Sequence, residues 1–214
     1  MEVQAHGNDF EDRLIRNIAG VSKKEYEKMI PNGYTSALDI HKGTLSDFNG
    51  SVKVTGSKGI GCGDIVRFMT EAATTSFKLI VARWTQENKT TKRFTEVLEF
   101  DFTPEDYSKV FGTVDVSVIK EFVDYVKSIP AGKEAQQANK TVWKERRDAI
   151  KHDNNIGLIS IDAKIDSKNQ RRVQTALNID ALVESGVKFT RHTKNYRGIE
   201  LNYTVTSGAR TFDK

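Results

Sequence analysis

Two charged residues in the first third of the chain have the types and spacing that phosphodiester hydrolysis requires. Residues 34–68 predict two short strands joined by a polar turn, with Asp39 on the first strand and Lys53 on the second. Side chains alternate between the faces of a strand, so both charged groups can project from the polar face when the apolar faces pack together. A carboxylate can bind a divalent metal ion, and an ammonium group can orient a water molecule. The pair therefore provides the minimum chemistry for cutting a phosphodiester.

A helix is expected upstream of this pair. Phe10, Leu14 and Ile18 recur every four residues and give the helix one buried stripe. Glu11 lies on the same helix. The order along the chain is therefore a helix with a carboxylate, a strand with Asp39, and a neighbouring strand that carries a lysine.

This order of elements resembles the core of the PD-(D/E)xK nucleases, a superfamily that includes many type II restriction endonucleases. The resemblance covers roughly residues 6–83. It implies an α/β fold with a restriction-endonuclease-like mixed β-sheet core flanked by helices. It also implies that Asp39 binds Mg²⁺, that Lys53 orients or deprotonates the attacking water, and that Glu11 supports the metal ion or its waters.

The chain departs from the superfamily pattern at two positions. Leu38 stands before Asp39 in place of proline, and Ser51 occupies the second acidic position, so the triplet reads Ser-Val-Lys. The serine removes one metal carboxylate but stays among the expected catalytic residues. The backbone carbonyl of Val52, a water held by the serine, or the carboxylate of Asp64 would have to complete the metal shell. Mg²⁺ keeps several waters and often binds only one or two carboxylates, so the site is chemically feasible.

A second acid–lysine pair leaves an alternative open. Asp162 and Lys164 form a literal D-x-K on a strand predicted over residues 157–165, and this triplet fits the superfamily pattern better than Ser-Val-Lys. It lacks the helix and strand that precede the first pair. For the first pair, an aspartate at the end of one strand and a lysine in the next can also be an ordinary cross-strand pair at the surface.

Basic and amide side chains late in the chain predict contact with DNA. Arg can donate two hydrogen bonds to guanine, Asn and Gln can pair with adenine, and Lys and Arg bind phosphates. Both segments concerned can also be solvated hairpin tips. The residues expected to contact DNA, with Arg171, Arg172 and Gln174 as base readers, are Lys168, Asn169, Gln170, Arg171, Arg172, Gln174, Arg191 and Lys194.

The rest of the chain shows further strand and helix patterns. Their order predicts one nuclease domain over residues 1–214, with a possible seam near 130–155 between a catalytic core and a DNA-recognition part. The expected strands are 77–84, 93–102, 157–165, 172–177, 187–193 and 199–206, and the expected later helices are 116–129, 134–150 and 178–185.

Composition is compatible with a nucleic-acid partner and excludes some other classes. The 214 residues include 33 Lys and Arg against 29 Asp and Glu, a net charge of +4. The single cysteine, Cys62, excludes an intramolecular disulfide and a cysteine-based zinc site, and it favours a reducing, cytoplasmic location. No segment approaches the roughly 20 apolar residues of a membrane span, so no membrane partner is expected.

These features together predict a Mg²⁺-dependent endonuclease that hydrolyses double-stranded DNA. The resemblance favours a sequence-specific type II restriction enzyme that acts as a homodimer, because a two-fold protein can match a palindromic site. Two alternatives stay open. One is a structure-selective repair or junction nuclease, and the other is a non-catalytic nucleic-acid-binding protein.

Overall fold

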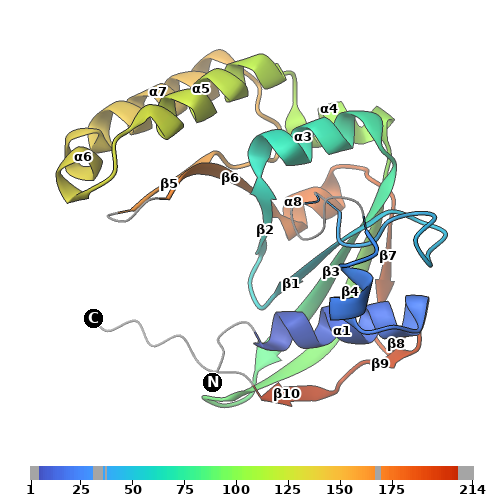
Figure 1. Ribbon diagram of the computed structural model, residues 1–214. Coiled ribbons are helices and arrows are strands. Elements are labelled where there is room, and N and C mark those ends of the chain that lie inside the picture. Colours follow the sequence, from blue (N-terminus) through green and yellow to red (C-terminus); the bar gives the residue numbers. More distant parts are fainter. Residues whose placement is uncertain (1–4, 31–35, 37, 167–169, 207–214) are drawn as a thin grey trace. The chain divides into compact units, whose positions relative to one another are not determined.

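The chain forms two compact units, which are described separately. The computed structural model describes residues 5–30, 36, 38–166 and 170–206 (Figure 1). The first unit is built from Met1–Ile60, Ser76–Phe102 and Lys188–Lys214, and the second from Gly61–Thr75 and Thr103–Val187. The predicted mixed α/β class is confirmed, since helices flank β-sheets that contain both parallel and antiparallel pairs. The single-domain organisation stays a prediction, and residues 130–155 lie wholly within the second unit.

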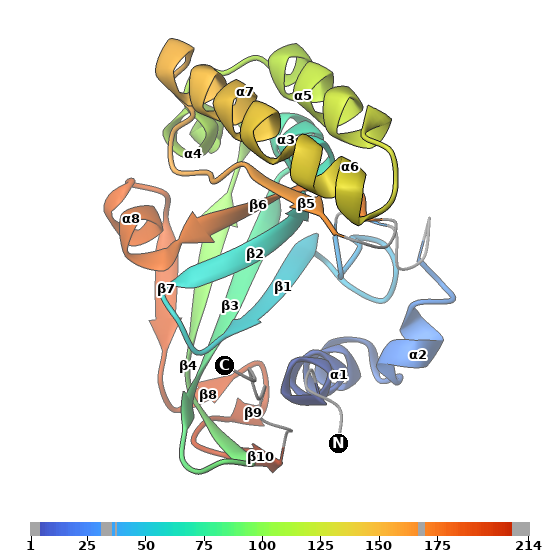
Figure 2. The same ribbon diagram turned by 90° about the vertical axis from the view of Figure 1, so that its left-hand side faces the viewer.

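A mixed sheet forms the centre of the first unit. Its strands follow the order β1-β3-β4-β10, and β7 also pairs with β4 (Figure 2). Strand β1 is parallel to β3, whereas β3 and β4 are antiparallel. The elements of this unit are α1 (Ala5–Ala19), α2 (Lys23–Tyr26), β1 (Gly50–Thr55), β3 (Phe77–Gln86), β4 (Thr91–Phe102), β7 (Phe189–His192), β8 (Asn195–Tyr196), β9 (Ile199–Glu200) and β10 (Thr204–Thr206).

The predicted stripe of the first helix packs on this sheet. Phe10 and Leu14 are fully buried and belong to the same apolar cluster as Val52 of β1 and Ile80 of β3. Burying side chains of this size removes much apolar surface from water, at about 25 cal/mol per Å². This packing fixes α1 against β1, and it thereby positions the polar residues of both elements.

The strand expected to carry Asp39 is not a strand, and this prediction is wrong. Ile40 forms an isolated antiparallel bridge with Gly50, and the chain between them turns irregularly. The amide oxygen of Asn49 accepts a hydrogen bond from the backbone N–H of Lys42 at 2.9 Å. Such side-chain bonds compete with the backbone ladder, which explains why this polar segment does not extend.

The second unit contains a smaller sheet and most of the later helices. Its strand order is β2-β6-β5, and the β5–β6 pair is antiparallel. The elements are β2 (Gly59–Asp64, whose first two residues are counted with the first unit), α3 (Ile65–Thr74), η2 (Pro104–Asp106), α4 (Tyr107–Phe111), α5 (Val116–Ser128), α6 (Lys133–Ala138), α7 (Lys140–Asp153), β5 (Asp162–Ile165), β6 (Arg171–Asn178) and α8 (Ile179–Glu184).

Helix α5 forms the core of the second unit together with β6. Phe122 and Val126 of α5 are buried, as are Val173 and Leu177 of β6. Helices α6 and α7 follow, and neither contains a buried residue. None of the helices in the described part of the chain is long and apolar enough to cross a membrane.

Candidate active site

The structure brings Asp39 and Lys53 together beside β1. Lys53 Nζ lies 3.4 Å from Asp39 Oδ2, and the two side chains are 19% and 30% exposed. The same oxygen accepts a 2.6 Å hydrogen bond from the backbone N–H of Val52 and lies 3.4 Å from the hydroxyl of Ser51. The spacing of these residues predicted their contact. Their catalytic role stays a prediction.

Asp39 lies at the free edge of β1, the side away from β3, where the backbone of Gly50 bonds Asp39 and Ile40. In an extended strand, the N–H and C=O of one residue point to the same side. The N–H of Val52 points to Asp39, whereas the carbonyl of Asn49, just before β1, accepts from the backbone N–H of Lys78 of β3 at 2.8 Å. Backbone groups alternate between the two sides of a strand, so the Val52 carbonyl also faces the free edge. The edge therefore offers a carbonyl oxygen next to the Asp39 carboxylate.

Glu11 joins this edge from α1 and is paired with a lysine that the sequence did not indicate. Its Oε2 lies 2.7 Å from Nζ of Lys23, at the start of α2. Burial and the nearby carboxylate of Asp39 raise the pKa of Glu11 above the ordinary glutamate value, and Lys23 and Lys53 oppose this shift. We call Glu11, Lys23, Asp39 and Lys53 the acid–lysine cluster; it carries two negative and two positive charges.

A local signal could have located Lys23. Ser22 and Glu25 form a capping box, in which each side chain bonds the other residue's backbone N–H, and this sets the first turn of α2 at Lys23. The backbone N–H of Lys23 also donates to Asp12 Oδ1 at 2.8 Å. This bond to α1 holds the lysine beside Glu11.

The oxygen groups at the β1 edge fit a Mg²⁺ ion that keeps several of its waters. Within the part of the chain that the structure describes, Asp39 Oδ1 accepts no hydrogen bond, so its lone pairs are available. The Val52 carbonyl and the Glu11 carboxylate are the further oxygen donors, and Ser51 can hold a water. Nowhere in the described ranges do three or more His, Cys, Asp or Glu side chains converge as a metal centre. Mg²⁺ often takes only one or two carboxylates from a protein and keeps several waters.

The remaining proposed metal residue, Asp64, belongs to the second unit. Its Oδ1 accepts a 2.9 Å hydrogen bond from the backbone N–H of Arg67, and this bond caps the N-terminus of α3. The glycine-rich residues 59–64, which end in Asp64, form strand β2. The partner of β2 is β6, which lies far along the chain.

The alternative pair on β5 has different surroundings. The hydroxyl of Ser160 donates to Asp162 Oδ2 at 2.5 Å and accepts from the backbone N–H of Ala176 at 2.9 Å. Asp162 and Lys164 form no ion pair with each other. The Asp162 carboxylate is thus bound within its own hairpin, whereas the Asp39 carboxylate contacts Lys53 of β1.

The residues expected to read bases are in three different situations. The guanidinium of Arg171 donates to the backbone carbonyls of Ile129 and Asp166, both at 2.9 Å. Arg172 is exposed, and Gln174 is half-buried. The neighbouring Lys168 and Asn169 lie outside the described residues, and Gln170 is exposed at the start of β6.

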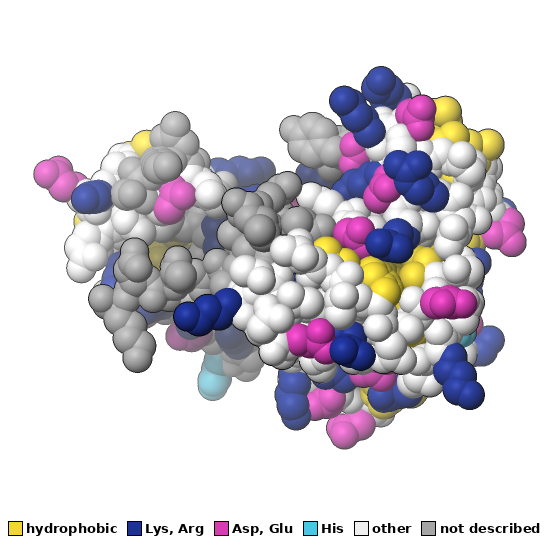
Figure 3. Space-filling view, turned by 90° about the horizontal axis from the view of Figure 1, so that it is seen from below, with side chains coloured by type: hydrophobic (Ala, Val, Ile, Leu, Met, Phe, Trp, Pro, Cys, Tyr) yellow, Lys and Arg dark blue, Asp and Glu magenta, His cyan; other side chains and the backbone are white. Residues whose placement is uncertain are grey.

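The second predicted basic segment lies in the first unit and is partly neutralised. Arg191 on β7 forms an ion pair with Glu96, which also binds Arg83. Lys194 is exposed. On the face that Figure 3 shows, Lys and Arg side chains alternate with Asp and Glu side chains. Net positive charge is therefore not gathered into one stripe on that face.

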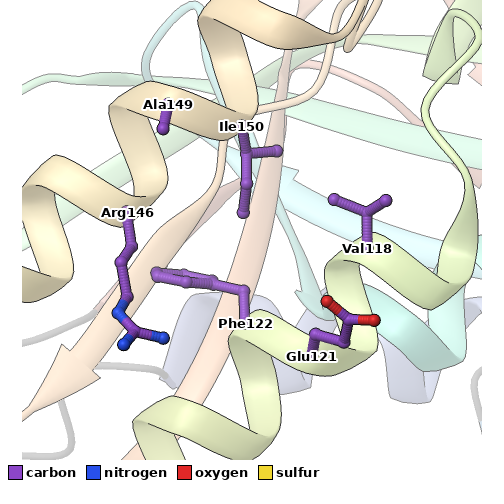
Figure 4. Close-up of a pocket in the computed structure, with 6 residues that line it drawn as sticks. All are labelled: Val118, Glu121, Phe122, Arg146, Ala149 and Ile150. Atoms are coloured by element: carbon purple, nitrogen blue, oxygen red, sulfur yellow. The ribbon is translucent and has the colours of Figure 1, made fainter.

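A shallow groove of about 220 Å³ lies between α5 and α7. Figure 4 shows the Phe122 ring pointing from α5 toward α7. Arg146 crosses the groove rim and stacks over the Tyr125 ring at 4.0 Å. The groove is mostly apolar and contains no paired carboxylates, so it lacks the chemistry of the β1 edge. Its lining residues are Val118, Glu121, Phe122, Arg146, Ala149 and Ile150.

Comparison with known proteins adds nothing to this geometry: no protein-family model, curated protein or solved structure matches the chain.

Proposed function

We propose that this protein is a Mg²⁺-dependent endonuclease that hydrolyses phosphodiester bonds in double-stranded DNA. The observation that supports the proposal is the meeting of Asp39, Lys53 and the backbone of Val52 at the free edge of β1. Glu11 reaches the same edge from α1. The order of these elements is the one that resembles the PD-(D/E)xK nucleases.

The residues divide the chemistry between them. The N–H of Val52 holds Asp39 Oδ2, which leaves Oδ1 to face a metal ion. Lys53 donates hydrogen bonds and can hold the attacking water in line with the phosphate. Ser51 supports Asp39 from the strand, and Glu11 can accept hydrogen bonds from metal-bound water. A bound Mg²⁺ would supply charge stabilisation and lower the pKa of water.

A sequence-specific type II restriction enzyme is the form of nuclease that we propose. Cutting both strands of a palindromic site then follows most simply from a homodimer. A cytoplasmic location belongs to the same proposal, because a single buried cysteine, Cys62, suits a reducing compartment.

Digestion of a defined plasmid tests the proposed activity. We expect discrete fragments with Mg²⁺ and none with EDTA, and end sequencing of the fragments gives the recognition site and the stagger. Cleavage confined to branched or damaged DNA would identify a structure-selective nuclease instead. Binding of DNA without cleavage in either Mg²⁺ or Mn²⁺ would show that the protein is a binding module.

A further inference from the structure

The antiparallel β5–β6 pair, which we call the ribbon, lies at one edge of the three-stranded β2-β6-β5 sheet and has two distinct faces. Its register places Lys164 opposite Arg172 and Asp162 opposite Gln174. These four side chains share one face, because paired residues and residues two apart lie on the same side of a sheet. We call this the outer face of the ribbon. The other face carries Val173, which is fully buried.

The outer face holds two like charges directly opposite each other. Lys164 and Arg172 are both exposed, and neither forms an ion pair with any residue in the described ranges. Like charges at directly opposed positions destabilise an antiparallel pair. The nearest acid along β5, Asp162, is bound by Ser160 instead. The ribbon therefore keeps an uncompensated cation pair that an anionic ligand would neutralise.

Arg171 fixes the ribbon that carries this cation pair. Its guanidinium donates to the carbonyls of Ile129 and Pro130, which follow α5, and to those of Asp166 and Gln170 in the ribbon's own turn. Hydrogen bonds from a charged donor are stronger than neutral ones. Because successive residues of a strand face opposite sides, fixing Arg171 inward directs Arg172 outward.

We propose that the outer face of the β5–β6 ribbon docks on the backbone of duplex DNA. Lys164 and Arg172 bind phosphates, Gln174 lies beside them within reach of base edges, and Arg171 is a positioning residue. The inference rests on the proposed function for its partner. It is favoured by charge complementarity between the cation pair and a polyanion.

The first test measures binding of the full-length protein to a short DNA duplex of arbitrary sequence. Fluorescence anisotropy is recorded over a NaCl series, in EDTA and again in Ca²⁺, so that no cleavage is needed. Lys164→Ala and Arg172→Ala should each reduce the slope of log affinity against log salt by about 0.9, the value for one lost phosphate contact. Lys120→Ala removes the same charge from an exposed position on α5 and should keep the parental slope.

A charge reversal separates lost contact from lost folding. Lys164→Glu would face Arg172 with the opposite charge, and such a pair stabilises a ribbon. We expect a thermal midpoint equal to or above that of the parent, together with weaker duplex binding than Lys164→Ala. A variant that folds at least as well and still binds DNA less tightly cannot owe its defect to misfolding.

Several results would overturn the inference. Parental salt slopes in both Lys164→Ala and Arg172→Ala would show that the outer face is only solvated, and so would parental affinity in Lys164→Glu. A parent that binds no duplex in either EDTA or Ca²⁺ would have the same consequence. The plasmid digestion keeps the two proposals apart. If the protein cleaves the plasmid and the Lys164 and Arg172 variants bind DNA as the parent does, only the docking inference fails. If binding depends on these residues but no DNA is cleaved, only the nuclease proposal fails.

Discussion

The free edge of β1 and the outer face of the β5–β6 ribbon both carry lysine close to aspartate, but the lysines have different partners in the two regions. At the β1 edge, Lys53 contacts Asp39 at 3.4 Å and Lys23 contacts Glu11 at 2.7 Å. On the ribbon, Lys164 faces another cation. The first arrangement is formally neutral within the chain, whereas the second leaves two exposed cations without an ion-pair partner among the described residues.

This difference shows that the local pattern of an acid and a lysine does not define a catalytic pair. What distinguishes the β1 edge is the Val52 N–H, which holds one oxygen of Asp39 and leaves the other available. Partial burial also strengthens the interactions of these charges relative to water. A fixed, half-buried acid suits metal chemistry, whereas exposed and unpaired cations suit docking.

The largest expected effect is the difference in DNA cleavage between substitutions of Lys53 and of Lys164. Lys53→Ala should reduce DNA cleavage by at least about 10²-fold, the usual contribution of a residue that handles the proton of the reacting water. Duplex binding in EDTA should stay near the parental value. Lys164→Ala should instead lose cleavage only as far as it loses binding, and low salt should restore both. Equal, salt-independent losses in the two variants would remove the distinction between the regions.

The next effect distinguishes two adjacent arginines by stability. Arg171→Ala should lower the free energy of unfolding by about 1.5–3 kcal/mol, because it removes charge-assisted hydrogen bonds to backbone carbonyls. Arg172→Ala should change it by no more than about 0.5 kcal/mol, as is usual for an exposed side chain. Urea unfolding of both variants measures this difference. Comparable destabilisation by the two substitutions would contradict the division into a positioning residue and a contact residue.

Substitutions of Ser51 sharpen the account of the β1 edge. Ser51→Asp would add a carboxylate beside Asp39, and we expect it to lower stability in EDTA by about 1–3 kcal/mol without preventing folding. Added Mg²⁺ should recover more stability in this variant than in the parent, because a bound cation relieves the repulsion. Thermal unfolding with and without the metal checks this expectation.

A second Ser51 variant addresses activity. Ser51→Ala should lose less cleavage than Asp39→Ala, since the hydroxyl lies 3.4 Å from the aspartate and only supports it. A Ser51→Ala variant as inactive as Asp39→Ala would mean that the hydroxyl itself takes part in the reaction. The relative cleavage rates at saturating Mg²⁺ decide between these roles.

The smallest effect concerns the stability of the first unit at acid pH. Burial tends to raise the pKa of Glu99, but hydrogen bonds from Lys78 and Tyr196 outweigh it and hold the pKa below the ordinary value. A depressed carboxyl pKa adds stability above the ordinary pKa, and this stability is lost as pH falls through the folded-state value. The free energy of unfolding should therefore fall less steeply below about pH 5 in Glu99→Gln than in the parent.

Tyr196→Phe is the matched variant for this measurement. It keeps the Glu99 carboxylate and removes one of the hydrogen bonds that lower its pKa, so its acid dependence should lie between those of the parent and Glu99→Gln. Urea unfolding over a pH series measures all three proteins. Parallel curves for the three would show that Glu99 contributes nothing to acid stability.

Strong local periodicity made parts of the fold predictable. Phe10 and Leu14 are buried as their spacing predicts, and β3 and β4 span the strands expected at 77–84 and 93–102. The pairing of strands that are distant in the sequence cannot be predicted from local sequence patterns. Residues 59–64 form a strand despite their glycines because β6 provides a partner more than a hundred residues later. The segment with Asp39 looked like a strand, but its own side chains bond its backbone.

The candidate site was predictable to the same extent. The spacing of Asp39 and Lys53 predicted their contact. The backbone donor of Val52 has no signature in the sequence, and Lys23 reaches Glu11 only because α2 turns back on α1. Strand alternation predicts that Arg171 and Arg172 face opposite sides, but packing against α5 decides which of the two points inward.

A comparison of two isosteric variants tests the central claim most directly. Asp39→Asn and Asp162→Asn each remove one carboxylate charge and leave the side-chain shape unchanged. Their cleavage of duplex DNA in Mg²⁺ is measured side by side with that of the parent, at protein concentrations that saturate binding. The account predicts that Asp39→Asn is inactive and that Asp162→Asn cuts at the parental rate. An active Asp39→Asn, or an inactive Asp162→Asn beside it, would contradict the assignment of the β1 edge as the active site.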